Sequence, residues 1–204
     1  PVVDGPQKKF AIELGRRLLK TEEYDPHVIF VSPYLRTRET LDFLMQGYPR
    51  LKSRNIRIYE DERIREQSRG LCDLYGDCRC FFVQYPEQLR LFKLEGPYWY
   101  KWPQGENVPE VRSRLRSWVS TLIREFAENP VWAVSHHLTL LALRANLERL
   151  TAEEFLRIDK EDKPVNLGVT KYVGKYRLGK EGRFVLRYYN KSFINTDYDS
   201  SPLT

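Results

Sequence analysis

Two adjacent histidines follow a short apolar run in the stretch "VWAVSHHLTLLALR", which begins at Val131 and ends at Arg144. The chain has only three histidines, and two of them are this pair, His136 and His137. An imidazole can bind phosphate oxygens or transfer a proton near neutral pH. The apolar run predicts a buried strand, and the leucine-rich pattern after it predicts a helix. We therefore expect His136 at the carboxyl end of a strand, beside a helix N-terminus that favours anions.

An arginine follows a second apolar run in "HVIFVSPYLRTRET" (27–40). Ser32 is expected to cap the next helix, and Pro33 to occupy its first position. Arg36 then lies in the first turn of that helix, where its planar, permanently charged guanidinium suits a phosphate or a carboxylate. Because function collects at the carboxyl ends of the strands in open α/β sheets, Arg36 and His136 are predicted to converge on one phosphate pocket.

The elements that must position these residues alternate between strands and helices. A capping box at 151–154 predicts the start of a further helix, and apolar spacing predicts helices in 6–20, 107–126 and 138–150. Short apolar runs predict strands at 27–31, at 131–134 and within 55–64, and two runs joined by "GKEG" (179–182) predict a closing hairpin. This order predicts one domain with an α/β fold and a mainly parallel central sheet.

Residues 71–105 are rich in aromatic residues, glycine and proline, and they read as an irregular lid or substrate insert. Its candidate substrate-contacting side chains are aromatic: Tyr98, Trp99, Tyr100 and Trp102. The alternative interpretation is that these rings only cover the core.

Three cysteines, Cys72, Cys78 and Cys80, fall within the same segment. Their odd number favours free thiols and a reducing, cytoplasmic location over a disulfide framework. A zinc site is the weaker interpretation, because the spacing fits no common zinc finger. The formal net charge of +6 suits anionic substrates or nucleic acid. No interleaved basic and aromatic platform for single strands is present, so we expect no nucleic-acid partner and, without a span-length apolar run, no membrane partner.

The element "SP-x-x-RT-x-x-T" and, about a hundred residues later, "VSHH" resemble the histidine phosphatase superfamily, also called phosphoglycerate mutase-like. Two further motifs keep the order of that family: "RIREQSRG" (63–70) and "WPQGENVPEVRSRL" (102–115). The resemblance extends to about Phe193 and is closest to small, broad-specificity phosphatases. Residues 194–204 form a tail without a family counterpart.

The resemblance implies a three-layer sandwich that hydrolyses small phosphomonoesters through a phosphohistidine, without a metal or a cofactor. Arg36 matches a phosphate-clamping arginine, and His136 matches a histidine that binds the transferring phosphoryl group. Glu66 matches the residue that protonates the leaving oxygen, although a solvated loop carboxylate is the alternative. His137 occupies the position of a family glycine at the pocket edge, and it is a candidate phosphate-binding residue together with Arg36 and His136. The oligomeric state is left open, with a homodimer as one option.

One family element is missing from the 204 residues: an apolar strand that ends in Arg-His-Gly, whose histidine is the nucleophile. We expect this strand, which is central to the family's sheet, to lie upstream of Pro1, since its loss would leave sheet edges unpaired. Two alternatives to a hydrolase stay open. One is phosphoglycerate mutase-type transfer, and the other is a non-catalytic phospho-ligand-binding protein.

Overall fold

The computed structural model describes residues 5–20, 25–175 and 183–194. Its helices are α1 (Pro6–Leu19), α2 (Leu35–Gly47), α3 (Arg50–Ser53), α4 (Cys78–Gln84), α5 (Pro86–Trp99), α6 (Val108–Phe126), α7 (His137–Leu147) and α8 (Ala152–Glu161). Two 3-10 turns are η2 (Glu62–Ile64) and η3 (Gly70–Tyr75). The strands are β1 (Val28–Val31), β2 (Arg57–Glu60), β3 (Val131–Val134), β4 (Val169–Lys175) and β5 (Arg183–Lys191).

A three-stranded parallel sheet in the order β2-β1-β3 forms the centre of the fold. Val31 at the end of β1 is aligned with Glu60 in β2 and with Val134 in β3. All three strands therefore end at one level, and the loops that leave them share one edge of the sheet. The predicted parallel sheet is confirmed. The predicted hairpin is present as the antiparallel pair β4-β5, and its "GKEG" turn lies outside the described residues.

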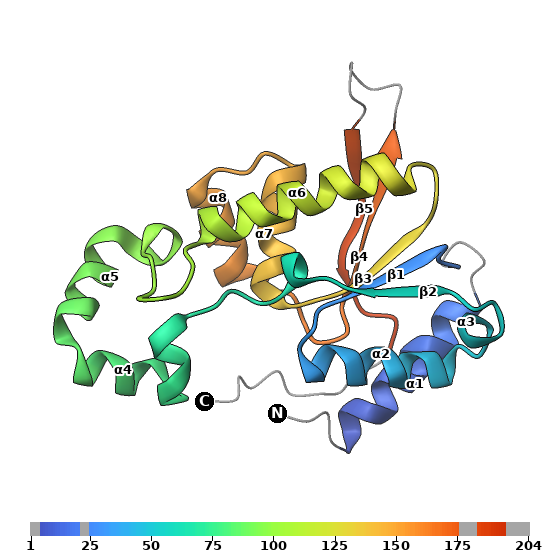
Figure 1. The fold of residues 1–204 in the computed structure, drawn as a ribbon, viewed down its shortest axis with the longest axis horizontal. Coiled ribbons are helices and arrows are strands. Elements are labelled where there is room, and N and C mark those ends of the chain that lie inside the picture. The colour runs from blue at the N-terminus through green and yellow to red at the C-terminus, as the bar shows by residue number, and fades with distance from the viewer. Residues whose placement is uncertain (1–4, 21–24, 176–182, 195–204) are drawn as a thin grey trace.

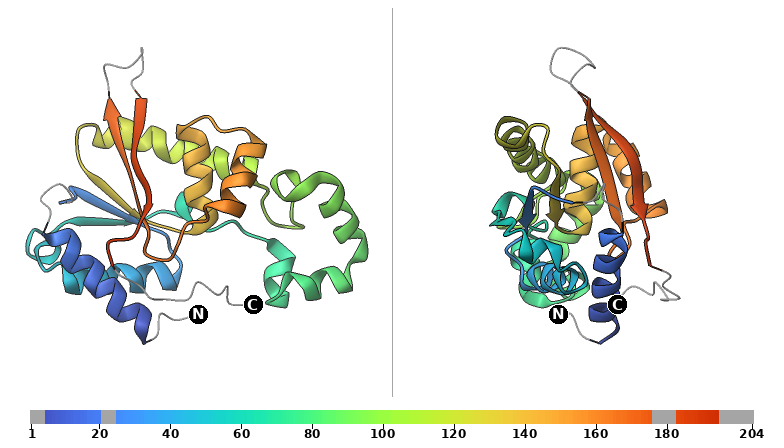
Figure 2. Two further views of the ribbon diagram at one scale, coloured as in Figure 1. Left: turned by 180° about the vertical axis from the view of Figure 1, so that it is seen from behind. Right: turned by 90° about the vertical axis from the view of Figure 1, so that its right-hand side faces the viewer.

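The side chains of β1 alternate between two apolar layers, as the period of a strand requires. Val28 and Phe30 pack into a cluster with residues of α6, α7 and α8. Ile29 and Val31 pack into a second cluster with residues of α1 and α2. Figures 1 and 2 show these two groups of helices on opposite sides of the sheet. The three-layer arrangement is confirmed, and its central strand is buried along its whole length.

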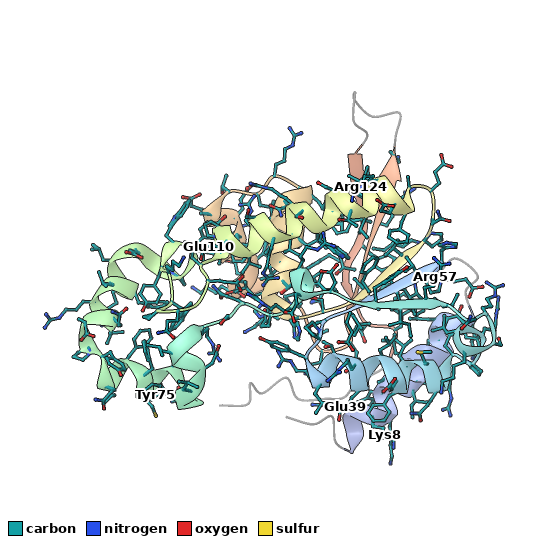
Figure 3. The ribbon with its side chains drawn as sticks, viewed as in Figure 1. Lys8, Glu39, Arg57, Tyr75, Glu110 and Arg124 are labelled. Atoms are coloured by element: carbon teal, nitrogen blue, oxygen red, sulfur yellow. A yellow bond between two sulfur atoms is a disulfide. The ribbon has the colours of Figure 1, made fainter. Side chains whose placement is uncertain are left out.

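Local signals account for the helices that frame the site. Thr151 and Glu154 form the predicted capping box at the start of α8, and Asn107 and Glu110 form a second one, which was not predicted, at the start of α6. Glu110 lies at the amino end of α6 and Arg124 in its last turn, which complements the helix dipole (Figure 3). The predicted cap at Ser32 is wrong. Helix α2 begins at Leu35 with Tyr34 at its N-cap position and without a side-chain cap, so Ser32 lies outside the helix and the prediction of Pro33 as its first residue is wrong as well. The Ser32 side chain has another partner, described below.

Strand β3 is less buried than its apolar sequence predicts. Its residues are half-buried except Ala133, which is exposed. The reason lies in its position, because in the described sheet β3 pairs with β1 along one edge only. The backbone groups on its other edge have no strand partner there.

The prediction of an irregular segment at 71–105 is wrong, because most of it is helical (η3, α4 and α5) and it projects from one end of the sheet (Figure 1). The aromatic residues of this segment were predicted to lie in an irregular loop. Instead, Phe81, Tyr100 and Trp102 form a separate small core together with Cys72. Burial of these rings stabilises short helices whose own propensity is weak.

The prediction of three free thiols is also wrong. Cys72 and Cys78 form a disulfide, with their Cα atoms 5.7 Å apart, and Cys80 is free and exposed. The η3 turn brings the first two cysteines together, and a count of cysteines cannot reveal that. No helix of the described residues is long and apolar enough to cross a membrane. Within the same residues no cluster of three or more His, Cys, Asp or Glu side chains is arranged to hold a metal ion.

Candidate active site

The two predicted pocket residues meet directly. Arg36 Nη2 lies 2.9 Å from His136 Nδ1, although the residues are 100 positions apart in the chain. Nε2 of the same imidazole lies 2.7 Å from Ser32 Oγ. Because an arginine can only donate, Nδ1 is the acceptor, and Nε2 carries the ring proton and donates a hydrogen bond to Ser32 Oγ. The ring is thus held in one tautomer by two partners at the carboxyl end of β1.

His136 is neutral in this arrangement. It is only 8% exposed, and burial, together with the charges of Arg36 and Arg114, lowers its pKa to about 3. A neutral ring suits its position, since a protonated Nδ1 would face the Arg36 guanidinium. His136 is not among the residues that line the nearby cavity, so its predicted contact with phosphate stays a prediction.

The ring of Tyr34 packs against both Arg36 and His136. The guanidinium of Arg36 lies over the Tyr34 ring, 4.8 Å from its centroid, and the His136 ring contacts the same tyrosine at 5.0 Å, edge to face. Thr37 fixes the turn that carries them, because its buried hydroxyl donates to the carbonyls of Ser32 and Tyr34. Within the described residues, Nε and Nη1 of Arg36 have no hydrogen-bond partner. These donors are available to an anion.

Glu66 lies in a loop whose backbone carbonyls are hydrogen-bonded one after another. Ser135 Oγ donates to Ile64 O (2.7 Å), and Thr139 Oγ1 donates to Arg65 O (2.6 Å). Arg114 donates to the carbonyls on either side of these, Arg63 O (2.5 Å) and Glu66 O (3.3 Å). The backbone of this loop, defined here as the acid loop (63–66), is therefore fixed by residues of α6, of α7 and of the turn after β3.

Arg114 is itself held by Glu106. Its Nε donates to Glu106 Oε1 at 2.9 Å, and both side chains are 14% exposed. Glu106 Oε2 also accepts from Arg65 Nη1 (2.9 Å) and from the backbone N–H of Ser68 (3.1 Å). The motif "WPQGENVPEVRSRL" therefore has a structural role, because its residues Glu106 and Arg114 connect the acid loop to α6.

A polar cavity of about 570 Å³ opens beside these groups. Its lining residues are Tyr34, Arg36, Glu66, Gln67, Arg69, Asp73, His137 and Leu138. The Glu66 carboxylate accepts from the Gln67 backbone N–H at 3.0 Å. The structure thus brings Arg36, Glu66 and His137 to one cavity. His136 does not line the cavity, but it is hydrogen-bonded to Arg36, which does.

The other histidines have different surroundings. His137 Nε2 lies 2.7 Å from Asp159 Oδ1 on α8, and this partner lowers the pKa of the Asp159 carboxyl. His137 thus lies at the cavity wall with one nitrogen already engaged. His27 is exposed at the amino end of β1, at the opposite end of the sheet from the site. Its backbone N–H donates to Pro130 O.

The predicted substrate-contacting aromatics do not line this cavity. Tyr98 is buried against Phe155, and its hydroxyl accepts from Arg112. Trp102 belongs to the small core of the 71–105 segment, and Trp99 is 57% exposed. The geometry favours the alternative interpretation for Tyr98 and Trp102, namely that they cover the core.

Several residues with a role here were not singled out from the sequence. Ser32 was read as a cap, whereas its hydroxyl accepts from His136. Arg114, Ser135 and Thr139 position the acid loop through its backbone, which a sequence pattern does not show. A usable signal was present only for Arg114 and Glu106, in the motif quoted above.

The sequence model of the histidine phosphatase superfamily (branch 1) matches residues 8–176. The chain belongs to this superfamily. The match covers the SP-x-x-RT element, the acid loop and the "VSHH" stretch, so the assembled cavity lies within the family region.

Two curated plant proteins are similar to this chain. Phosphoglycerate mutase-like protein AT74H of Arabidopsis thaliana is 30% identical over 144 residues, which are 64% of this chain and 47% of that protein. Phosphoglycerate mutase-like protein AT74 of the same plant is 33% identical over 104 residues, 49% of this chain and 29% of that protein. The chain thus spans about half or less of the length of these relatives.

Solved structures share the fold. Bacillus stearothermophilus YhfR superposes with a TM-score of 0.71 at 22% identity, covering 92% of this chain and 84% of that one. A mycobacterial glucosyl-3-phosphoglycerate phosphatase in complex with inorganic phosphate gives 0.66 at 22% identity, covering 91% and 85%. The alpha-ribazole phosphatase from Shigella flexneri gives 0.64 at 16% identity, covering 88% and 81%.

Replacing Arg114 with Met should lower the free energy of unfolding by about 3 kcal/mol, because Glu106 would lose one of its two arginine partners and the carbonyls of Arg63 and Glu66 would lose their donor. Urea unfolding followed by circular dichroism measures the loss. Arg116→Met, at an exposed position of the same helix, is the matched control and should cost less than about 0.5 kcal/mol. Equal losses in the two variants would contradict the assigned role of Arg114.

The pH dependence of stability tests the neutral state of His136. Its folded pKa of about 3 is below the ordinary 6.5, so below pH 6.5 the unfolded chain binds a proton that the folded chain excludes. This contribution to stability is complete above pH 6.5 and is lost as the pH falls towards 3, at up to about 1.4 kcal/mol per pH unit. Unfolding between pH 7 and pH 4 should show a shallower loss for His136→Asn. His27→Asn, which removes an exposed imidazole at the other end of the sheet, should keep the steeper one.

Proposed function

We propose that this protein hydrolyses phosphomonoesters, with the phosphate bound at Arg36 and the alcohol part of the substrate in the adjoining cavity. The observation that carries the proposal is the meeting of Arg36, His136 and Ser32 at the carboxyl ends of β1 and β3, beside a cavity that Glu66 also lines. A guanidinium with free donors and a carboxyl group in one polar cavity supply the two parts that ester cleavage needs.

The chemistry divides between these residues. Arg36 stabilises negative charge on the oxygens of the phosphoryl group as it is transferred. Glu66, when protonated, gives its proton to the alkoxide that leaves as the ester P–O bond breaks. The resulting carboxylate then accepts a proton from the water that attacks phosphorus in the second step. His136 acts on Arg36, since its neutral Nδ1 accepts from the guanidinium and fixes its direction.

The proposed reaction also needs a nucleophile. None of the three histidines is placed to attack a phosphate bound at Arg36. His136 has both nitrogens engaged, His137 is paired with Asp159, and His27 lies at the far end of the sheet. We propose that a strand ending in Arg-His-Gly, which the family resemblance implies, pairs with the free edge of β3. Its histidine nitrogen would then attack phosphorus beside Arg36, and water would break the P–N bond of the phosphohistidine.

Hydrolysis is proposed over mutase-type transfer because the cavity rim is open. Arg69 and Asp73 at the cavity wall are 45% and 44% exposed, which leaves water access to a phosphoenzyme. A metal is not required by this scheme, so chelation should leave turnover unchanged. Cytoplasmic location stays a prediction from the sequence, and the Cys72–Cys78 disulfide counts against it.

A second candidate function is binding of phosphorylated ligands without turnover. The observation that favours it is that none of the three histidines has an imidazole nitrogen placed to attack a phosphate at Arg36. Turnover by the protein encoded by the complete gene distinguishes the two functions, since a binding protein would take up phosphate at Arg36 and release no product.

Replacing Arg36 with Ala should lower the kcat for a phosphomonoester by about a hundred- to a thousand-fold, because one transition-state donor is lost. Phosphate release from a panel of esters by the complete gene product, with and without EDTA, measures it. Arg38→Ala on the same helix is the matched control, because Arg38 is exposed and pairs with Glu60 instead. Full activity in Arg36→Ala would remove Arg36 from the site, and loss with EDTA would contradict the scheme without a metal.

Replacing Glu66 with Gln should slow hydrolysis of alkyl phosphates far more than hydrolysis of p-nitrophenyl phosphate. The physical reason is that an alkoxide needs a proton as it leaves, whereas nitrophenolate does not. The ratio of the two kcat values, measured in wild type and variant, reports the effect. Glu62→Gln is the control, because Glu62 is exposed and does not line the cavity. An equal loss on both esters would assign Glu66 a binding or structural role.

A further inference from the structure

The cavity extends beyond the residues that the proposed chemistry uses. Arg36 and Glu66 belong to bond cleavage, and Tyr34 lies against Arg36. His137 is paired with Asp159. The remaining polar lining residues, Gln67, Arg69 and Asp73, follow the acid loop and lead into η3. These three residues are called the outer wall. Their position next to Glu66 puts them where the alcohol part of a bound ester would lie.

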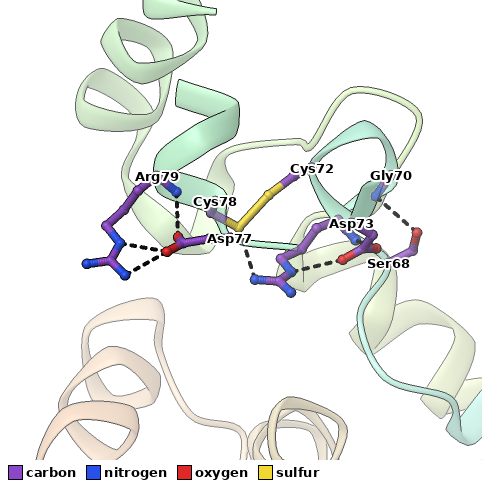
Figure 4. Close-up of a disulfide and its surroundings, with 8 residues drawn as sticks. Ser68, Gly70, Cys72, Asp73, Asp77, Cys78 and Arg79 are labelled. Atoms are coloured by element: carbon purple, nitrogen blue, oxygen red, sulfur yellow. Dashed lines mark hydrogen bonds and ion pairs between the residues drawn. A yellow bond between two sulfur atoms is a disulfide. The ribbon is translucent and has the colours of Figure 1, made fainter. Parts of the chain in front are cut away.

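Arg69 is held by three contacts. Two of the contacts hold the side chain itself and the third is made by the backbone: its Nε donates to Asp73 Oδ1 at 3.1 Å, and the Arg69 backbone N–H donates to Asp73 Oδ2 at 2.8 Å. Its Nη1 donates to the Sγ of Cys78, which is bonded to Cys72. Figure 4 shows Asp73 and the disulfide side by side. Within the described part of the chain, Nη2 of Arg69 has no protein partner, so two fixed N–H donors remain for a ligand.

The outer wall offers donors and acceptors without an excess of charge. Asp73 balances the charge of Arg69 and keeps lone pairs for further hydrogen bonds. Gln67 Nε2 donates to Glu106 O at 2.8 Å, and its side-chain oxygen has no partner among the described residues. A second anion would meet the carboxylates of Asp73 and Glu66. A hydroxyl group fits better, because it can donate to a carboxylate and accept from an N–H at the same time.

We infer that the Arg69–Asp73 pair determines substrate specificity by binding hydroxyl groups on the alcohol part of the substrate. The preferred substrates are then phosphate esters of polyhydroxy alcohols, such as sugar or sugar-alcohol phosphates. This inference rests on the proposed function. Sites built to hydrogen-bond a hydroxyl discriminate strongly against analogues that lack it. Because this pair is about half-exposed, the expected discrimination is about ten-fold, well below that of a buried site.

The test compares two esters of equal chain length, sorbitol 6-phosphate and hexyl phosphate, with the complete gene product. Wild type should show a kcat/KM about ten-fold higher for the sorbitol ester. Arg69→Met and Asp73→Asn should each bring the ratio close to one, mainly through a higher KM for the sorbitol ester, and leave hexyl phosphate hydrolysis nearly unchanged.

The chain provides a matched control across the disulfide. Arg79 pairs with Asp77 in the same way, through its backbone N–H and its Nε, both at 2.8 Å, but neither residue lines the cavity (Figure 4). Arg79→Met and Asp77→Asn should therefore keep the wild-type ratio. Matching losses in the Arg69 and Arg79 variants would assign the effect to the stability of the segment and overturn the inference.

Other outcomes separate the inference from the proposed function. If both esters are hydrolysed equally well, or if a hexyl ester with a terminal carboxylate is the best substrate, the hydroxyl preference is wrong while the phosphatase proposal stands. If no ester is hydrolysed, the proposed function fails. Calorimetric binding of the two esters then still tests the outer wall, since tighter binding of sorbitol 6-phosphate that depends on Arg69 supports it and equal binding overturns it.

Discussion

Four consecutive backbone carbonyls, those of Arg63 to Glu66, each accept a hydrogen bond from a side chain. Partly buried carbonyls that have no backbone N–H partner need hydrogen-bond donors from side chains. Here the donors come from Arg114, Ser135 and Thr139, so the acid loop cannot move without breaking contacts to α6, to α7 and to the turn after β3. The position of Glu66, and of the outer wall that follows it, depends on this constraint.

The parallel register of the sheet adds the second half of the site. Since β1 and β3 end at the same level, the residues that follow them, Ser32 and His136, can share a hydrogen bond. The central strand is buried on both faces, and its loops are therefore the parts of the chain free to carry polar groups. The neutral state of His136 follows from the same burial, because a charged ring there would lack water and would face Arg36.

The segment 71–105 changes how the cavity can be used. Its aromatic core is separate from the two clusters that flank the sheet, and its disulfide lies next to the Arg69–Asp73 pair. Of the polar residues that line the cavity, Asp73 comes from this segment, whereas Arg36 and Glu66 come from the parts of the chain that follow β1 and β2.

The sequence by itself determined the order of the strands and of the helices that flank them, the parallel sheet and the convergence of Arg36 with His136. These follow from apolar periodicity and from motifs whose residues are close along the chain. Only the tertiary structure decided that Ser32 holds His136 instead of capping a helix, that Tyr98 and Trp102 are core residues, and that Cys72 and Cys78 are bonded. The edge position of β3 and the contacts of Arg69 belong to the same group. The physical reason is that each of these depends on which groups compete for a partner after folding, and residues far apart in the chain become competitors only when the layers pack.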